Sequence, residues 1–314
     1  MTGYHTSTNA STIAFLGLTL IVGCTGGRGP IEEPRTEHPA PVEQIDEGGE
    51  VTPQKAPRER ETIVGLQCIA AAYGDFIREI RNEHESARAV VVMNDGTEIR
   101  WEDGVEGKTF EQLLNEPDLR DQMSMSYPLG RRSEAPGIND DPGRIRVERF
   151  FKSIYGADKQ AVKDNLVTVN WMPKHAGGKL RFNKLNGAAQ ALSAVSSQLD
   201  DGLAKDLLKY VNPTAGTFNW RKIAGTARLS VHSFALAVDT NLEHSGYWRW
   251  TKKKDPSLPY RNKIPFEIVE VFEEHGFIWG GKWYHFDTMH FEYRPELLHP
   301  LCVRGASGLK TEAE

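Results

Sequence analysis

The sequence predicts an α+β fold in which helices flank a small antiparallel sheet and an α+β extension precedes this core. Two β-prone runs around an Asp-Gly turn at residues 89–101 predict a hairpin in the extension. Apolar residues at three- and four-residue steps within residues 186–211 predict an amphipathic helix in the core. Aromatic and branched residues at 234–239 and 283–287 predict strands or strand ends.

The first residues of the chain have the pattern of an export signal. Residues 12–23 form an apolar run of signal-peptide length, which is short for a helix that spans a bilayer. The run ends at Cys24, and residues 21–24 resemble the lipobox of bacterial lipoproteins, in which the signal is removed and the cysteine is acylated. We therefore expect a signal peptide at residues 1–23 and a lipid anchor to the membrane at Cys24. A plain secretory signal is the alternative, because no Lys or Arg precedes the apolar run.

Residues 24–60 are rich in Pro, Gly, Glu and Arg and contain almost no residue that could join an apolar core. This composition predicts a disordered tether. We expect the α+β extension at 61–175, the core at 176–304 and a flexible tail at 305–314. The lipobox resemblance implies a location in the bacterial cell envelope. Because Thr25 follows the cysteine, it implies the periplasmic side of the outer membrane in a two-membrane bacterium.

The elements of the extension follow from local patterns. A helix is expected at 61–81, and two strands are expected on either side of the turn at 94–97. A further helix is expected at 110–123. Gly, Pro and Asp residues predict a loop at 133–143.

Two helices are expected in the core, one within residues 186–211 and one at 265–275. In the first, the apolar residues that recur at three- and four-residue steps should pack in the core: Leu192, Val195, Leu199, Leu203 and Leu207. The second starts with a proline, which suits a first turn, and is followed by a glycine.

Length, charge and cysteine content limit the class of protein. A chain of 314 residues with 39% hydrophobic residues can bury one substantial core. The formal net charge of -5 argues against a nucleic-acid partner, which needs a strongly basic surface. If Cys24 carries lipid, Cys68 and Cys302 remain, an even number in an oxidising compartment. A disulfide between them is a possible pairing, and neither has the spacing of a metal ligand.

Three side chains near the strand signals have the composition of a metal site. His232, Asp239 and His290 supply the three protein ligands of a catalytic zinc site, which leaves a fourth position open. Asp287 lies close to His290 and is the candidate general base for water activated by zinc. Positions three or seven apart point to opposite faces of a regular strand. At least one member of each pair is therefore expected on a loop, bend or bulge.

These residues resemble a known family. Residues 230–239 and 287–292 are similar to the Ser-x-His-x-x-Gly-x-Ala-x-Asp and Asp-x-x-His patterns of the M15 peptidases. That family includes D-alanyl-D-alanine carboxypeptidases and dipeptidases and L-alanyl-D-glutamate endolysins. The resemblance covers about residues 180–300. It implies that the three candidate ligands bind Zn2+ and that Asp287 is the general base.

Three further positions bear on the resemblance. The family's glycine between the first two ligands is Ala235 here, and a glycine there indicates close packing or a positive φ, which alanine disfavours. The family also uses an upstream arginine to hold a substrate carbonyl or carboxylate. Arg221, which follows an aromatic residue, is the candidate for this role, and Arg228 is the competing one.

Two neighbours of the motifs have open roles. Glu292 is expected either to orient a ligand imidazole or to form a surface salt bridge with Arg294. His285 is a rival for proton handling, although burial for structural reasons is the expectation.

Together, these features predict a zinc peptidase that hydrolyses amide bonds in peptidoglycan stem peptides, at D-Ala-D-Ala or at L-Ala-D-Glu. Carboxypeptidase and endopeptidase action both stay open. One alternative is a catalytically inactive, zinc-containing binding module of the cell envelope, as in the signalling domain of Hedgehog proteins, which resembles these peptidases. The other is an exported zinc peptidase that acts on other peptides.

Overall fold

The computed structural model describes residues 57–82, 89–132 and 134–306, which fall in one compact unit. The expected signal peptide, Cys24 and most of the expected tether lie outside the described residues. Among the helices of the described ranges, none combines the length and the apolar character needed to cross a membrane.

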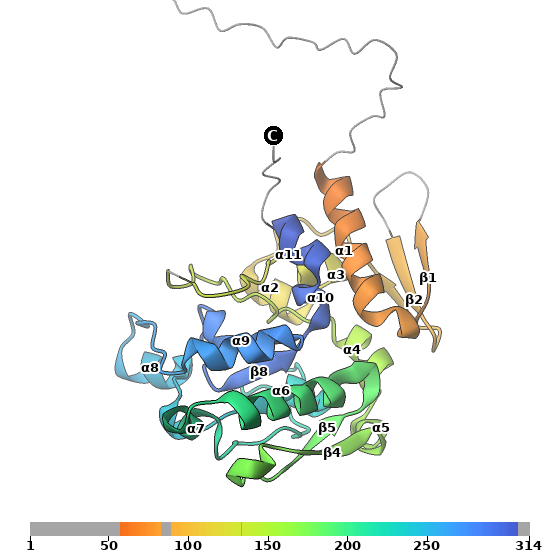
Figure 1. Cartoon of the computed structure of the whole chain (residues 1–314). Helices are drawn as coiled ribbons and strands as arrows, with labels where there is room; N and C mark the ends of the chain where they lie inside the picture. Colours follow the sequence, from red (N-terminus) through yellow and green to blue (C-terminus); the bar gives the residue numbers. More distant parts are fainter. Residues whose placement is uncertain (1–56, 83–88, 133, 307–314) are drawn as a thin grey trace, which may run out of the picture. The chain divides into compact units, whose positions relative to one another are not determined.

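The fold is α+β, as predicted, with small antiparallel sheets set among helices (Figure 1). The sheets of the described ranges have the strand orders β1-β2-β3, β4-β5 and β6-β8-β7. The strands are β1 (Ile77–Asn82), β2 (Ala89–Met93), β3 (Glu98–Arg100), β4 (Leu166–Asn170), β5 (Lys179–Asn183), β6 (Ala237–Asp239), β7 (Phe277–Trp279) and β8 (His290–Tyr293). The α-helices are α1 (Pro57–Tyr73), α2 (Phe110–Asn115), α3 (Leu119–Met123), α4 (Glu148–Tyr155), α5 (Lys159–Asp164), α6 (Ala188–Gly202), α7 (Leu208–Val211), α8 (Trp248–Lys254), α9 (Phe266–Glu274), α10 (Pro295–Leu298) and α11 (Pro300–Ala306).

The first predicted helix is displaced toward the amino terminus. It starts at Pro57, inside the expected tether, and ends at Tyr73 instead of continuing to residue 81. The chain then forms β1, which pairs with the fully buried β2. The predicted hairpin of β2 and β3 is confirmed, and the Asp95 carboxylate accepts a hydrogen bond from the Thr97 amide at 2.8 Å in its turn.

The helix predicted at 110–123 is two short helices, α2 and α3. Pro117 separates them, because proline cannot supply an amide hydrogen to a continuing helix. Thr109 and Asp118 each cap the helix that follows them with a reciprocal capping box. The predicted loop at 133–143 contains no helix or strand in its described residues.

The two core helices pack beside each other (Figure 1). Leu192, Val195 and Leu199 of α6 are fully buried, as predicted. The single long helix was wrong, because α6 ends at Gly202 and α7 follows separately, so that Leu203 and Leu207 lie outside α6 and are half-buried. Phe272 of α9 stacks on Phe291 of β8, with ring centres 3.8 Å apart. This contact fixes the strand on which His290 lies.

The two ends of the described chain meet. Helix α1 packs against α10 and α11, and a disulfide joins Cys68 to Cys302. The Tyr73 hydroxyl donates a hydrogen bond to the Glu296 carboxylate at 2.6 Å. Strand β4 precedes residue 176 and strand β5 follows it, and the two strands pair. The expected boundary between extension and core therefore falls within a sheet. The division into these two domains remains a prediction.

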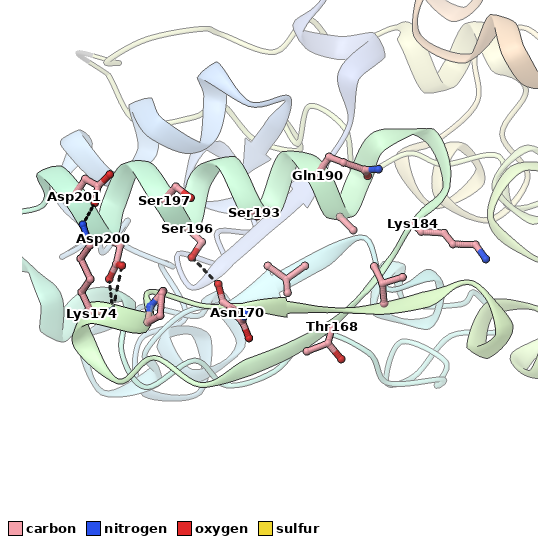
Figure 2. Close-up of a pocket in the computed structure, with 14 residues that line it drawn as sticks. Thr168, Asn170, Lys174, Lys184, Gln190, Ser193, Ser196, Ser197, Asp200 and Asp201 are labelled. Atoms are coloured by element: carbon pink, nitrogen blue, oxygen red, sulfur yellow. Dashed lines mark hydrogen bonds and ion pairs between the residues drawn. The ribbon is translucent and has the colours of Figure 1, made fainter.

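A polar groove of about 650 Å³ lies between α6 and β4 (Figure 2). Ser196 donates a hydrogen bond to the carbonyl of Asn170 at 3.0 Å. Asp200 accepts the backbone amide of Lys174 at 3.1 Å, and the side chain of Lys174 pairs with Asp201. These interactions join the helix to the strand, and none of the candidate site residues lines the groove.

Candidate metal centre

Strand pairing brings two of the three candidate ligands together. Asp239 is the last residue of β6 and His290 is the first residue of β8, and the antiparallel register places them directly opposite each other. Opposite residues of an antiparallel pair carry their side chains on the same face. The Asp239 Oδ1 atom therefore lies 3.0 Å from His290 Nδ1.

The third ligand reaches the site from a short helix and a tight turn. His232 lies in a 3₁₀-helix, η5 (Val231–Phe234), and Ala235 then turns the chain into β6 with φ 53°. Of the two features that the family's glycine indicates at this position, close packing or a positive φ, the structure shows a positive φ, which alanine adopts here. The expected irregular backbone is also present, since His232 lies on a 3₁₀-helix and Asp287 lies on the segment before β8.

The three ligand atoms form a nearly equilateral triangle. His232 Nε2 lies 3.2 Å from Asp239 Oδ1 and 3.2 Å from His290 Nδ1, and the third side of the triangle is 3.0 Å. Ligand atoms about 2.0–2.1 Å from a tetrahedral zinc ion lie about 3.3 Å from one another. Two imidazoles and a carboxylate at this spacing therefore fit a zinc ion in both chemistry and geometry.

Contacts behind the imidazoles orient them toward the triangle. His232 Nδ1 donates to the backbone carbonyl of Thr217 at 2.6 Å, which leaves the Nε2 lone pair free for a metal. His290 Nε2 lies 3.4 Å from Glu292 Oε2, which leaves Nδ1 to face the site. The sequence motifs contain no signal for Thr217, because it acts through its backbone.

Glu292 takes both of its expected roles, but the salt bridge is buried. Besides the contact to His290, its carboxylate lies 3.2 Å from Arg146 Nη1 and 3.2 Å from Arg294 Nη1, and its side chain is fully buried. Burial by itself would raise the pKa of Glu292. The positive charge of Arg146 and the contacts with His290 and Arg294 outweigh burial and lower the pKa of Glu292 to about 2.

The charges of the triangle shift the pKa values of its own members. Burial favours a lowered pKa of His290, but the Asp239 and Glu292 carboxylates raise that pKa to about 10. Burial likewise favours a raised pKa of Asp239, but His232 and His290 hold it well below its usual range. Because a ligand imidazole must be neutral, metal binding competes with the proton that these carboxylates favour on His290.

Asp287 is held beside the triangle by its backbone. Its amide donates to the Gly280 carbonyl at 3.0 Å, and its carbonyl accepts the His290 amide at 3.2 Å. A Cβ on Gly280 would lie 2.6 Å from the Asp287 carbonyl oxygen, so this approach requires glycine.

The carboxyl of Asp287 has the properties of a proton acceptor. Its Oδ1 atom is shielded from solvent and accepts no hydrogen bond from the described residues. Burial raises the pKa of Asp287 to about 6, with His290 opposing the rise and Asp239 adding to it. A carboxyl whose pKa approaches neutrality can both accept and return a proton.

The two candidate arginines lie in different environments. Arg221 is exposed, and its amide donates to the Ser233 hydroxyl at 3.0 Å. Arg228 is half-buried, and its Nε atom has no hydrogen-bond partner among the described residues. Neither guanidinium bonds to a candidate ligand within the described part of the chain.

Motif reasoning missed two arginines of the site. Arg146 contacts Glu292, and Arg144 lies with its Cζ atom 5.9 Å from the ring centres of Trp248 and of Trp283. Both arginines follow an irregular loop, where an Arg-x-Arg pattern carries no structural signal. His285, expected to be buried, is half-buried, and its Nδ1 lies 2.7 Å from the buried Asp141 carboxylate.

Comparison with protein families places a match on this part of the chain. Residues 224–293 match the model of a peptidase family described as D-alanyl-D-alanine carboxypeptidase. The matched segment includes the three candidate ligands, Asp287 and Arg228, while Arg221 precedes it. Comparisons with curated proteins and with solved structures found no match.

Proposed function

We propose that this chain, whose residues 224–293 match the model of a peptidase family, is a zinc-dependent peptidase of the cell envelope that hydrolyses amide bonds in peptidoglycan stem peptides. The family match supports peptidase chemistry and peptidoglycan peptides as substrates. The observation that carries the zinc assignment is the triangle of His232, Asp239 and His290 ligand atoms, whose sides measure 3.0 to 3.2 Å.

The described residues support a hydrolytic mechanism. Bound zinc would supply a Lewis acid that activates water and polarises the scissile carbonyl. Asp287 would accept a proton from the attacking water while the new carbon–oxygen bond forms. It would then donate that proton to the nitrogen as the carbon–nitrogen bond breaks. One water is consumed, and the products are a carboxylate and an amine.

The test combines product analysis with a matched pair of variants. The zinc-loaded protein is incubated with purified muropeptides, with and without chelator, and products are identified by mass spectrometry. Loss of one alanine identifies a D,D-carboxypeptidase, and cleavage next to the sugar-proximal alanine identifies an endopeptidase. Asp287→Asn should lower kcat at least about 100-fold with unchanged zinc content. Asp206→Asn, which alters an exposed carboxylate, should leave kcat unchanged.

Two results would contradict parts of this proposal. Full activity of Asp287→Asn would remove Asp287 from the mechanism. Stoichiometric zinc without any chelator-sensitive product from muropeptides would favour the binding module or a peptidase for other peptides.

A further inference from the structure

The sheet of β4 and β5 has two outer edges, and within the described ranges only the edge of β5 is covered. The Thr217 hydroxyl donates to the Arg181 carbonyl at 2.7 Å, and the Asn183 amide donates to the Ala235 carbonyl at 3.1 Å. In the described part of the chain, β5 is the only strand that pairs with β4. Strand β4 is therefore an edge strand, and outward backbone groups of such a strand can pair with another chain.

The register shows which backbone groups of β4 point outward. Opposite residues of an antiparallel pair alternate between those that exchange hydrogen bonds and those that do not. Trp171, which continues β4, donates its amide to the Gly178 carbonyl at 2.9 Å, so Thr168 and Asn170 belong to the other set. The amide and the carbonyl of Thr168, and the amide of Asn170, therefore point toward the open edge.

Helix α6 lies beside this edge and satisfies one end of it (Figure 2). The Ser196 hydroxyl donates to the Asn170 carbonyl at 3.0 Å and accepts the Met172 amide at 2.8 Å. Among the described residues, none bonds to the outward amide or carbonyl of Thr168. Thr168 lines the groove of about 650 Å³ between α6 and β4, and this volume is within the range of ligand sites.

The groove has different charges at its two ends. Lys184 lies at one end and forms no ion pair with a described residue (Figure 2). The first turn of α6 lines this end as well, and a helix amino terminus carries a partial positive charge. Asp200 and Asp201 lie at the other end, where the side chain of Lys174 pairs with Asp201. The end at Lys184 therefore favours an anion.

We propose that the groove between α6 and β4 binds an extended, acidic segment of a partner protein. The segment adds to β4 as a further strand and places a carboxylate near Lys184. Backbone hydrogen bonds supply affinity in strand addition, and the neighbouring side chains supply specificity. Because none of the candidate metal ligands lines the groove, binding there does not depend on the proposed peptidase function.

Fluorescence anisotropy with labelled peptides tests the proposal on the full chain. The probe is the L-peptide Ser-Thr-Val-Thr-Val-Glu with fluorescein at its amino terminus, and its binding should saturate below about 1 mM. The same peptide with methyl groups on its two central amide nitrogens should bind at least about 5-fold more weakly, because backbone hydrogen bonds are lost. A neutral peptide, with Gln in place of Glu and a carboxyl-terminal amide, should bind about 2- to 5-fold more weakly.

Matched variants test the two parts of the site. Thr168→Pro removes an outward amide hydrogen, which an edge strand tolerates, and should weaken binding of the probe at least about 5-fold. Arg181→Pro makes the same change at the covered edge of β5 and should bind the probe as the unaltered protein does. Lys184→Gln should remove the preference for the acidic peptide. Lys179→Gln, which alters an exposed lysine of β5 outside the groove, should keep it.

Amide hydrogen exchange followed by NMR locates the bound peptide. The probe should slow exchange at the amides of Thr168 and Asn170, and thermal unfolding checks that each variant is folded. Unchanged exchange at these amides, equal binding of the methylated peptide, or full affinity of a folded Thr168→Pro would overturn strand addition. No binding up to about 1 mM peptide would overturn the site itself. The methylated peptide acts on the unaltered protein, so the test stands even if Thr168→Pro does not fold.

Discussion

At the scale of single residues, Ala235 forms a turn at a position where the M15 motif that this segment resembles has glycine. Its backbone lies in the left-handed region, with φ 53° and ψ 48°, and its side chain is fully buried. That conformation costs an L residue about 1–2 kcal/mol. The buried methyl contributes about 0.8 kcal/mol, and glycine would lose about 0.5–1 kcal/mol more backbone entropy. Because these effects nearly cancel, alanine can occupy this position.

This balance predicts different outcomes for two substitutions. Ala235→Gly should change the free energy of unfolding by less than about 1 kcal/mol. Ala235→Val should lower it by more than about 2 kcal/mol, because a branched side chain disfavours positive φ and the site is closely packed. Urea unfolding monitored by circular dichroism measures both. A valine variant as stable as the alanine protein would show that the turn is not required.

The candidate metal ligands and the candidate base could be predicted from residue type and spacing. The motifs with His232, Asp239, Asp287 and His290 lie in one matched family segment, and the structure places the three candidate ligand atoms together. Thr217 could not be predicted in this way, because its backbone carbonyl, and not its side chain, orients His232.

At the scale of elements, β8 combines a candidate metal ligand with core packing. Alternate residues of a strand point to opposite faces, so His290 and Glu292 share one face while Phe291 packs on Phe272 of α9. The strand holds a candidate ligand and its buried carboxylate partner in one rigid unit.

The pKa of Glu292 predicts an acid-sensitive contribution to stability. Its value of about 2 in the folded protein lies below the usual 4.5, so the ionised carboxylate stabilises the fold above pH 4.5. This contribution, on the order of 3 kcal/mol, is lost as pH falls toward 2. Glu292→Gln should therefore be less stable at pH 7, and its free energy of unfolding should change less between pH 5 and 2.

Denaturant unfolding across this pH range, with chelator present, measures the slope. Glu116→Gln, which alters an exposed carboxylate after α2, is the matched control and should keep the slope of the unaltered protein. Equal slopes for Glu292→Gln and the unaltered protein would contradict the pKa assignment.

At the scale of the whole molecule, the extension is tied to the candidate metal centre. Tyr73 of α1 bonds to Glu296, which pairs with Arg294, and Arg294 in turn pairs with Glu292. This network connects α1 to the carboxylate behind His290. The disulfide fastens the same helix to α11. Residues outside the family segment thus support the site directly.

The disulfide predicts a redox-dependent stability. Cys302→Ser should lower the free energy of unfolding by about 2–5 kcal/mol, because the unfolded chain gains freedom. Thermal unfolding with and without reductant measures this, and mass spectrometry after alkylation counts free thiols. A reductant should destabilise the unaltered protein and leave Cys302→Ser unaffected. Equal stability of both proteins without reductant would contradict a stabilising role.

Patterns that act over a few residues could be predicted from the sequence. The hairpin of β2 and β3 follows from its Asp-Gly turn, and the buried face of α6 follows from helical periodicity. The prediction of a helix at 61–81 was wrong beyond Tyr73, because residues 77–82 form strand β1, which pairs with β2. Strand pairing depends on a distant partner, so local propensity could not decide it.

The sequence by itself determined the α+β class, the types of the candidate ligands and the match of residues 224–293 to a peptidase family model, because these depend on residue identity and spacing. Only the tertiary structure decided that Asp239 faces His290 across two strands and that Arg144 and Arg146 approach Arg228. It also decided that the Nε atom of Arg228 is shielded from solvent and has no hydrogen-bond partner among the described residues. The physical reason is that strand register, burial and charge balance arise from contacts between segments far apart in the chain.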